Sequence, residues 1–460
     1  MIQNDLTIKA TFNDISESST LKFEEEKKKD IEYIMNRLVD PKSKITKDEI
    51  KNIGTLLVDK LFTPNIKKHF SDAKRKATNK GLRIRLKIES FDISNYPWET
   101  LYHEGKYLAA TIDTPLTRYI TVNETEFKKK YGKPMKILII GASPAAVGLP
   151  TVQVEREIQT IENVLQGEID NGFIKLDKEP IGEARKIMSH LNNEQYNVVH
   201  FIGHGVFKDN KGYLALEDEK GGLDPADHQR IGQMFQNQKS LGLVILNACQ
   251  GAVPSYENSI LSTYKGFGGL APELVKVAGV PSVIAMRYSI TNQMAHDFSK
   301  IFYPNLLKRP IDEIMQIVRQ NILVDSNADP REFTAPVLFM NSPDGIIFSP
   351  AETSGADDMA ISPSLEVKID QLKNYHEQLI NLSEAATLKG FWMLVWNIYK
   401  ENKNELDPII LKEIQKMITI VPTLFIEREE KLDEGLEEQA RSLKKTIMRN
   451  FNKLMSVIPP

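Results

Sequence analysis

The sequence contains very little cysteine. Cys249 is the only cysteine among 460 residues, so the chain can form no internal disulfide and no zinc site built from several thiolates. Cys249 is therefore either a small buried residue or a reactive thiol, because free cysteine is among the residue types most often buried. A polar Asn two residues before it and Gln-Gly directly after it favour the reactive thiol.

Long apolar runs and an excess of one charge are also missing. The longest compact apolar run, at residues 391–398, is far shorter than the roughly 20 residues of a transmembrane helix. The first residues are polar and do not resemble a secretory signal. Lys and Arg number 59 against 62 Asp and Glu, without the basic excess that binding to nucleic acid usually needs. We expect a cytoplasmic protein that binds no membrane and, by itself, no nucleic acid.

The order of patterns along the chain predicts an α/β protein with several domains. Residues 1–130 mix charged helical stretches with strand-like runs, which predicts an α+β accessory region. From 131 to 349, short apolar runs alternate with amphipathic helices, a pattern typical of a doubly wound, mostly parallel sheet. A chain of this length exceeds what one hydrophobic core usually organises, so more than one domain is expected.

The last part of the chain predicts a separate helical domain. Residues 350–363 are small, polar and bounded by prolines, so they predict a linker. Residues 364–460 show helical apolar spacing without an internal repeat, which predicts a small helical bundle. We expect this bundle to bind an activating or recruiting protein partner or to restrain the preceding domain. A passive, stabilising bundle is the alternative.

Five near-continuous apolar runs predict the central strands, at residues 135–140, 197–202, 241–246, 282–286 and 335–340. The second run leads into Gly203-His204-Gly205 and the third into Asn247-Ala248-Cys249. Function gathers at the carboxyl ends of the strands in such sheets. We therefore expect His204 and Cys249 to leave the sheet at the same edge.

A thiol and an imidazole at one edge can hydrolyse a peptide bond. The thiolate attacks the carbonyl, and a histidine accepts the thiol proton and later protonates the departing amine. We expect the backbone N–H groups of Gly205 and Cys249 to bind the oxyanion, with no metal or cofactor. His200 lies inside the predicted strand, so we expect it to be a packed, hydrogen-bonded structural residue.

A different interpretation treats residues 141–148, after the first central strand, as a phosphate-binding loop. The segment contains Pro144 and lacks the Lys-Ser/Thr pair of a P-loop. We therefore do not favour nucleotide binding.

The residues around Cys249 resemble the caspase pattern Q-A-C-[RQG]-G, with Asn247 in the first place. His204 lies 45 residues upstream, close to the typical separation of about 50. HFIGHG at residues 200–205, YLALED at 213–218, LNAC at 246–249 and the segments 266–287 and 335–345 resemble the CHAT domain, a relative of caspases, gingipains and separases. The resemblance extends upstream to about residue 80, so residues 80–130 belong to it as well.

The resemblance implies a caspase-like fold and a regulated cysteine endopeptidase that cuts a protein substrate through Cys249 and His204. A prokaryotic defence or programmed-death pathway is the implied setting. Several CHAT-like domains are scaffolds, so a catalytically silent interaction module is the alternative, although both dyad positions are retained here.

The resemblance also suggests residues for the specificity pocket. The residue two before the nucleophile lies at the floor of this pocket in caspase relatives, and Asn247 occupies that position. Arg287 and Asp218 are further candidates, although long charged side chains are mostly ordinary surface residues. Because Asn247 is neutral, we expect a neutral or polar residue before the cut. Trp98, in the upstream part, is expected to be a core residue.

Overall fold

The computed structural model describes residues 6–12, 15–21, 23–40, 42–77, 81–88, 91–122, 129–131, 133–146, 149, 151–208, 211–250, 270–288, 290–325 and 327–350. The chain divides into two compact units, residues 1–352 and 353–460. The predicted linker beyond residue 350 and the predicted helical bundle lie outside the described residues. Their boundaries stay predictions.

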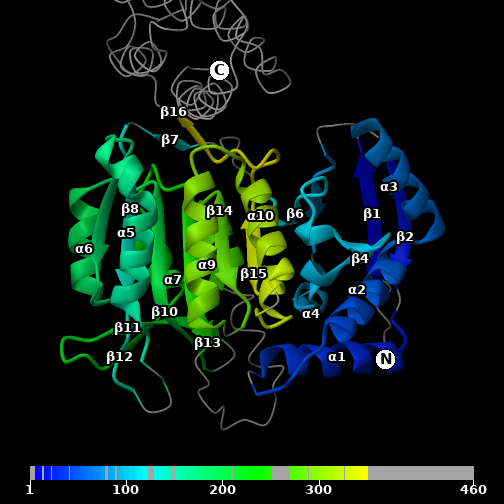
Figure 1. Cartoon of the computed structure of the whole chain (residues 1–460), viewed down its shortest axis with the longest axis horizontal. Coiled ribbons are helices and arrows are strands. Elements are labelled where there is room, and N and C mark those ends of the chain that lie inside the picture. The colour runs from blue at the N-terminus through cyan, green and yellow to red at the C-terminus, as the bar shows by residue number, and fades with distance from the viewer. Residues whose placement is uncertain are drawn as a thin grey trace, which may run out of the picture. The chain divides into compact units, whose positions relative to one another are not determined.

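A mixed, mostly parallel sheet organises the first unit (Figure 1). Its strands are β3 (Ile84–Leu86), β6 (Leu116–Tyr119), β8 (Met135–Gly141), β9 (Ile174–Glu179), β10 (Val198–Lys208), β11 (Lys211–Glu217), β12 (Leu223–Asp227), β13 (Leu243–Gln250), β14 (Ser282–Met286) and β15 (Pro336–Met340). The order is β12-β11-β10-β13-β14-β15-β6-β3, and β8 pairs with both β10 and β9. Strands β9, β8, β10, β13 and β14 run parallel, whereas β15 is antiparallel to β14.

Helices cover both faces of this sheet. They are α5 (Val154–Asp170), α9 (Asn292–Phe302) and α10 (Ile311–Val324) on one face, and α6 (Ala184–Asn193), α7 (His228–Phe235) and a helix at 270–276 on the other. Figure 1 shows α5, α9 and α10 side by side on the face toward the viewer. Along β8, Ile137 and Ile139 pack against the first group, and Leu138 and Ile140 against the second. Because successive strand residues point to opposite faces, this confirms the predicted α/β class with helices on both sides.

The first 130 residues fold as a mixture of helices and strands. They comprise β1 (Leu6–Phe12), β2 (Ile15–Leu21), α1 (Glu25–Val39), α2 (Lys47–Leu61), α3 (Pro64–Ala77), α4 (Phe91–Ser94), η2 (Trp98–Thr100), β4 (Tyr102–His103), β5 (Lys106–Tyr107) and η3 (Leu108–Ala110), besides β3 and β6. Trp98 is buried, and its Nε1–H donates to the Ile93 carbonyl at 2.9 Å, which confirms it as a core residue. Since β6 pairs with β15, this region extends the central sheet.

Short elements complete the description: β7 (Lys129–Tyr131), which pairs with β16 (Phe348–Pro350), and the turns of 3-10 helix η4 (Tyr303–Asn305) and η5 (Glu332–Thr334). None of the helices in the described ranges has both the length and the apolar character needed to cross a membrane.

Candidate active site

The two strands that carry the predicted dyad are neighbours. β10 and β13 pair in parallel, with Ile202 opposite Asn247 and His204 opposite Cys249. Residues paired in register lie on the same face of a sheet. For residues 248–250 the structure describes the backbone alone. The backbone therefore brings positions 204 and 249 side by side, inside the two strands and not beyond their ends as we expected.

The predicted ends of these strands are wrong. We expected the strands to stop at residues 202 and 246, but β10 continues to Lys208 and β13 to Gln250. The extension of β10 is paired on both sides, because Gly205 lies opposite Leu214 of β11 and opposite Gln250 of β13. Hydrogen bonding to two neighbours keeps an extended backbone through glycines that would otherwise indicate a strand end.

Gly203 allows a close contact between β10 and the part of the chain that follows β8. A Cβ at this position would lie 2.8 Å from the Phe201 ring and 2.9 Å from the Ala142 carbonyl oxygen. The Ala142 N–H donates to the Ile202 carbonyl at 2.8 Å, so the chain after β8 is held against β10 here. His204, the next residue, is buried. The glycine is thus needed for a close backbone approach directly before the proposed base.

A buried polar cluster lies on the same face, earlier along both strands: Asn247 is two residues before Cys249, and His200 is four residues before His204. Glu157 of α5 accepts a hydrogen bond from the Asn247 side-chain amide, and its Oε1 is 3.8 Å from His200 Nε2. On the other side of the ring, His200 Nδ1 is 2.7 Å from the Tyr303 hydroxyl. All four residues are almost completely buried. The cluster joins α5, β10, β13 and η4 beneath positions 204 and 249.

His200 has the structural role that its place in the strand predicted. It has no exposed surface, and it stacks on the Tyr303 ring with centroids 5.9 Å apart. Burial lowers the pKa of His200 to about 3, so the ring is neutral at physiological pH. The interpretation of His200 as a packed, hydrogen-bonded residue is confirmed.

Glu157 was missed at the level of sequence, although a signal was present. Burial raises the pKa of its carboxyl group to about 7, against the lowering effect of the hydrogen bond from Asn247. Val154, Ile158 and Ile161 are buried on the same helix, and position 157 lies among them at helical spacing. A carboxylate at helical spacing among apolar residues therefore indicates a buried acid, and a buried acid is a candidate functional residue.

Two candidates for the specificity pocket have other partners in the structure. Arg287 is 9% exposed, donates to the Tyr96 carbonyl at 3.0 Å, and lies 3.7 Å from the Glu99 carboxylate. Asp218 Oδ1 accepts from the backbone N–H groups of Lys220 and Gly222 in the turn between β11 and β12. Both side chains thus hold local structure, and their place in a substrate pocket stays a prediction.

The segment proposed as a phosphate loop already holds a carboxylate. The Ser143 N–H donates to Glu217 Oε1 at 2.8 Å, and the Ser143 hydroxyl oxygen accepts from the Val152 N–H at 3.0 Å. A negative charge at this backbone amide disfavours a second anion. Within the described part of the chain, no group of three or more His, Cys, Asp or Glu side chains is arranged to hold a metal ion.

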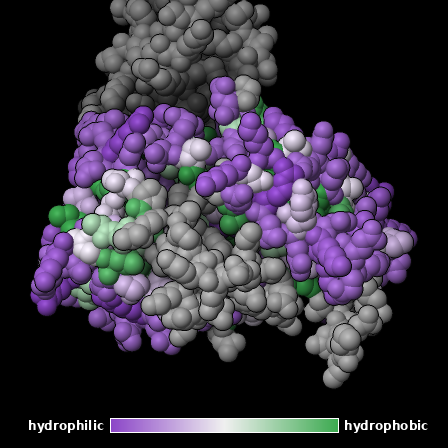
Figure 2. Space-filling view, turned by 90° about the horizontal axis from the view of Figure 1, so that it is seen from below, coloured by the Kyte–Doolittle hydropathy of each residue, from purple (hydrophilic) through white to green (hydrophobic). Residues whose placement is uncertain are grey.

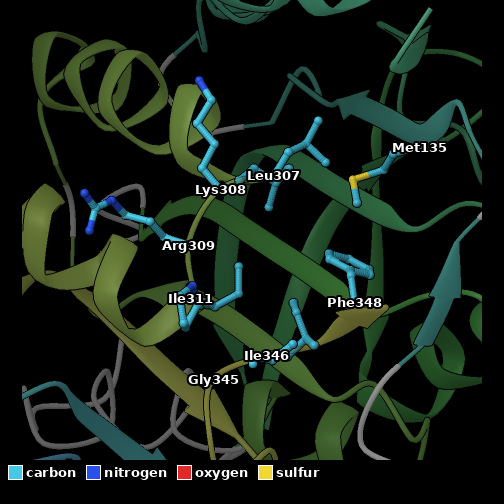
Figure 3. Close-up of a pocket in the computed structure, with 11 residues that line it drawn as sticks. Met135, Leu307, Lys308, Arg309, Ile311, Gly345, Ile346 and Phe348 are labelled. Atoms are coloured by element: carbon cyan, nitrogen blue, oxygen red, sulfur yellow. The ribbon is translucent and has the colours of Figure 1, made fainter. Parts of the chain in front are cut away.

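The surface at the carboxyl ends of the parallel strands differs from the surface at their amino ends. Figure 2 views the molecule from below Figure 1, toward the carboxyl ends, and the described residues around them are mainly hydrophilic. At the amino end of β8, a pocket of about 250 Å³ is lined by Met135, Leu307 and Phe348, while Lys308 and Arg309 extend outward (Figure 3). Since β8 and β10 are parallel, that pocket lies at the other end of the strands from His204.

Similarities to known proteins cover much of this chain. The CHAT domain family matches residues 51–376. Among solved structures, the chain is similar to the Drosophila initiator caspase Dronc at 9% identity, with a TM-score of 0.30, over 48% of this chain and 84% of that one. It is also similar to a secreted C11 cysteine protease from Bacteroides thetaiotaomicron, in complex with an irreversible peptide inhibitor, at 9% identity and a TM-score of 0.23, over 44% of this chain and 57% of that one. No curated protein matches the sequence.

Proposed function

The chain belongs to the CHAT domain family, and from this membership and the strand register we propose that it is a regulated cysteine endopeptidase. Cys249 is its nucleophile and His204 its general base. The family membership confirms the resemblance that the sequence motifs indicated. The proposal concerns the chemistry at the carboxyl edge of β10 and β13.

The register of the β10–β13 ladder carries the proposal. His204 and Cys249 are opposite each other, although 45 residues separate them in the sequence. A nucleophile and its base must lie within hydrogen-bonding reach in the reacting complex. Neighbouring strands in a sheet are about 5 Å apart, so pairing at this rung supports a contact between the two side chains in the reacting complex.

The proposed reaction divides peptide hydrolysis into two steps. His204 accepts the Cys249 thiol proton, and the thiolate attacks the peptide carbonyl carbon. The amide bond then breaks, the amine leaves with the proton from His204, and an acyl-enzyme remains. A water molecule attacks this thioester, with His204 accepting its proton, and releases the acid and the thiol. The backbone N–H groups of Gly205 and Cys249 are the proposed donors to each oxyanion.

The surroundings of the enzyme are part of the same proposal. A protein substrate is cut in the cytoplasm, in a prokaryotic defence or programmed-death pathway. The residues from 364 onward bind an activating or recruiting protein partner. A chain that waits for such a partner is latent on its own, which determines how activity must be measured.

Co-expression with candidate substrates tests the proposal under conditions that include the partner. The full chain is expressed together with the products of neighbouring genes, and new protein N-termini are identified by mass spectrometry. We expect cleavage by the wild type and none by Cys249→Ala or His204→Ala, because residues that act as one unit lose nearly all activity together. His228→Ala, at the start of α7, is the matched histidine control and should cleave normally.

Two results would contradict the proposal. Wild-type cleavage by a folded Cys249→Ala chain would exclude the thiol as nucleophile. Binding of partners without cleavage under any of these conditions would support a non-enzymatic interaction module instead.

A further inference from the structure

We propose that Glu157 is a positioning residue of the cysteine–histidine site: its carboxyl group holds the two dyad strands together through Asn247 and His200, which precede the dyad positions on the same face. This inference rests on the proposed function and goes beyond it, because it assigns a role to a residue that takes no part in bond making. Glu157 lies on α5, whereas the dyad positions lie on β10 and β13.

The contacts of Glu157 connect the strands close to the dyad. It accepts from the amide of Asn247, which lies two residues before Cys249, and its Oε1 is 3.8 Å from Nε2 of His200, which lies four residues before His204. A two-residue step along a strand covers about 7 Å on the same face. A movement of Glu157 therefore displaces β13 two residues before Cys249 and β10 four residues before His204.

Tyr303 fixes the other side of this connection. Burial raises the pKa of Tyr303 well above its ordinary value, with a further contribution from Glu157, so the phenol keeps its proton. Its O–H can donate to His200 Nδ1 across the 2.7 Å contact, which leaves the ring proton on Nε2, toward Glu157. Tyr303 thus fixes the orientation of the His200 ring, whose Nε2–H faces the Glu157 carboxylate 3.8 Å away.

The cluster is a poor arrangement for stability alone. Glu157 is buried next to Val154 and Ile158, where an apolar side chain would pack without loss of hydration. His200 Nε2 and Asn247 Oδ1 are buried and have no hydrogen-bond partner among the residues that the structure describes. Polar groups kept in such a place at a cost in stability are expected where they hold a functional geometry.

The Glu157 carboxyl group has two states near neutral pH, since burial raises its pKa to about 7. His200 and Tyr303 are the titratable groups that interact with it. On the other elements packed against α5, the titratable groups have different environments: His296 of α9 is influenced by Arg156 and Lys300, Lys178 of β9 pairs with Glu162, and Lys136 of β8 pairs with Glu194. Within the described ranges, the contacts of the Glu157 carboxyl group are to the neutral His200 ring and the Asn247 amide, so its protonation state can change without a charged partner beside it.

Alkylation of the single cysteine tests this role without any substrate. The rate at which iodoacetamide modifies the full chain reports Cys249 alone, because the chain has no other thiol. A glutamine imitates the neutral carboxyl group, so Glu157→Gln should match the wild type at pH 6. At pH 8.5 it should react about fivefold more slowly, because only the carboxylate gives Asn247 a charge-assisted hydrogen bond. Glu155→Gln, an exposed position on the same helix, should match the wild type at both pH values.

A second variant shows whether Glu157 acts through Asn247. In an Asn247→Ala chain, adding Glu157→Gln should cause a much smaller further change than in the wild type, since coupled residues are non-additive and only the contact with His200 remains. The same rate ratio at both pH values, or additive effects, would overturn the proposal and leave Glu157 as a structural residue. The His204→Ala rate tests the proposed function separately, in the co-expression samples in which the wild type cleaves: if it equals the wild-type rate there, the dyad is wrong, whatever the Glu157–Asn247 coupling. Thermal unfolding of each variant at both pH values identifies any chain that has lost its fold.

Discussion

His204 and Cys249 occupy the same rung of the ladder between β10 and β13, and their side-by-side position depends on the exact register of these strands. A slip of one residue would move one of them to the opposite face of the sheet. The contacts that maintain this register therefore have consequences for reactivity as well as for stability.

Gly203 gives the first prediction. An added Cβ would meet the Ala142 carbonyl oxygen at 2.9 Å, so Gly203→Ala must displace the backbone next to His204. We expect a loss of about 1–3 kcal/mol in the free energy of unfolding and slower alkylation of Cys249. Urea unfolding and the iodoacetamide rate measure the two effects.

Gly167, inside α5, is the matched glycine control. A Cβ there meets no atom within 4 Å, so Gly167→Ala should raise stability by up to about 1 kcal/mol. It should leave the alkylation rate unchanged. If Gly203→Ala also left both quantities unchanged, the close approach at Ala142 would have no role in positioning β10.

The second prediction concerns a buried ion pair that joins the accessory region to the sheet. Arg118 of β6 donates to both carboxylate oxygens of Glu99, at 2.9 and 2.7 Å, and both side chains are buried. Arg118→Ala leaves the carboxylate without its main partner and should lower the free energy of unfolding by about 3–5 kcal/mol. Arg230→Ala, in the more exposed pair with Asp224, should cost less than about 1 kcal/mol.

Glu99 also gives this pair a pH dependence. Burial alone would raise the pKa of Glu99, but Arg118 and Arg287 lower it to about 2. Since the folded pKa lies below the unfolded one, the stabilisation is complete above about pH 4.5 and is lost as the pH falls toward 2. Acid unfolding of the wild type and Arg118→Ala, monitored by circular dichroism, should therefore converge in this range. Parallel curves would contradict the assignment.

The third prediction concerns Glu157, where the sign is the reverse. Its folded pKa of about 7 lies above the unfolded value, so the folded state holds the proton more tightly. Ionisation of this group then lowers stability as the pH rises from about 4.5 to 7, by at most about 3 kcal/mol. Glu157→Gln has no such ionisation, so its melting temperature relative to the wild type should rise across this window. A constant difference would show that the carboxyl group titrates normally.

The fourth prediction concerns the residue before the cut. Asn247, which the resemblance to caspase relatives suggests for the floor of the substrate pocket, provides no negative charge for a substrate Arg or Lys. Profiling of the activated chain on a peptide library should favour neutral or polar residues at that position. A clear preference for Arg or Lys would contradict the assignment. The negative charge for such a substrate would then have to come from another residue, and Glu157, which contacts Asn247, is the candidate.

Strands that are apolar throughout could be predicted closely from sequence. The run at 282–286 is the structure's β14 without change, because buried parallel strands have near-continuous apolar sequences. β9 was not predicted, because its sequence IKLDKE is largely polar. It becomes a strand through its pairing with β8, which a local pattern does not show.

The positions of His204 and Cys249 could be predicted from the sequence, but the contacts that hold their two strands could not. His204 and Cys249 follow apolar runs, and local patterns of this kind are visible in a sequence. Contacts such as Asn247 with Glu157 join residues 90 positions apart. They depend on how α5 packs against the sheet, which no local pattern encodes.

β14 pairs with the whole length of β15 on one side, and β6 covers its other side at Phe339 and Met340. The covering strands β6 and β3 are supplied by the first 130 residues of the same chain. If that part unfolds while the rest of the sheet persists, the backbone donors and acceptors of β15 become available to a second molecule. Destabilising changes in the accessory region should therefore produce insoluble aggregates, in addition to any loss of activity.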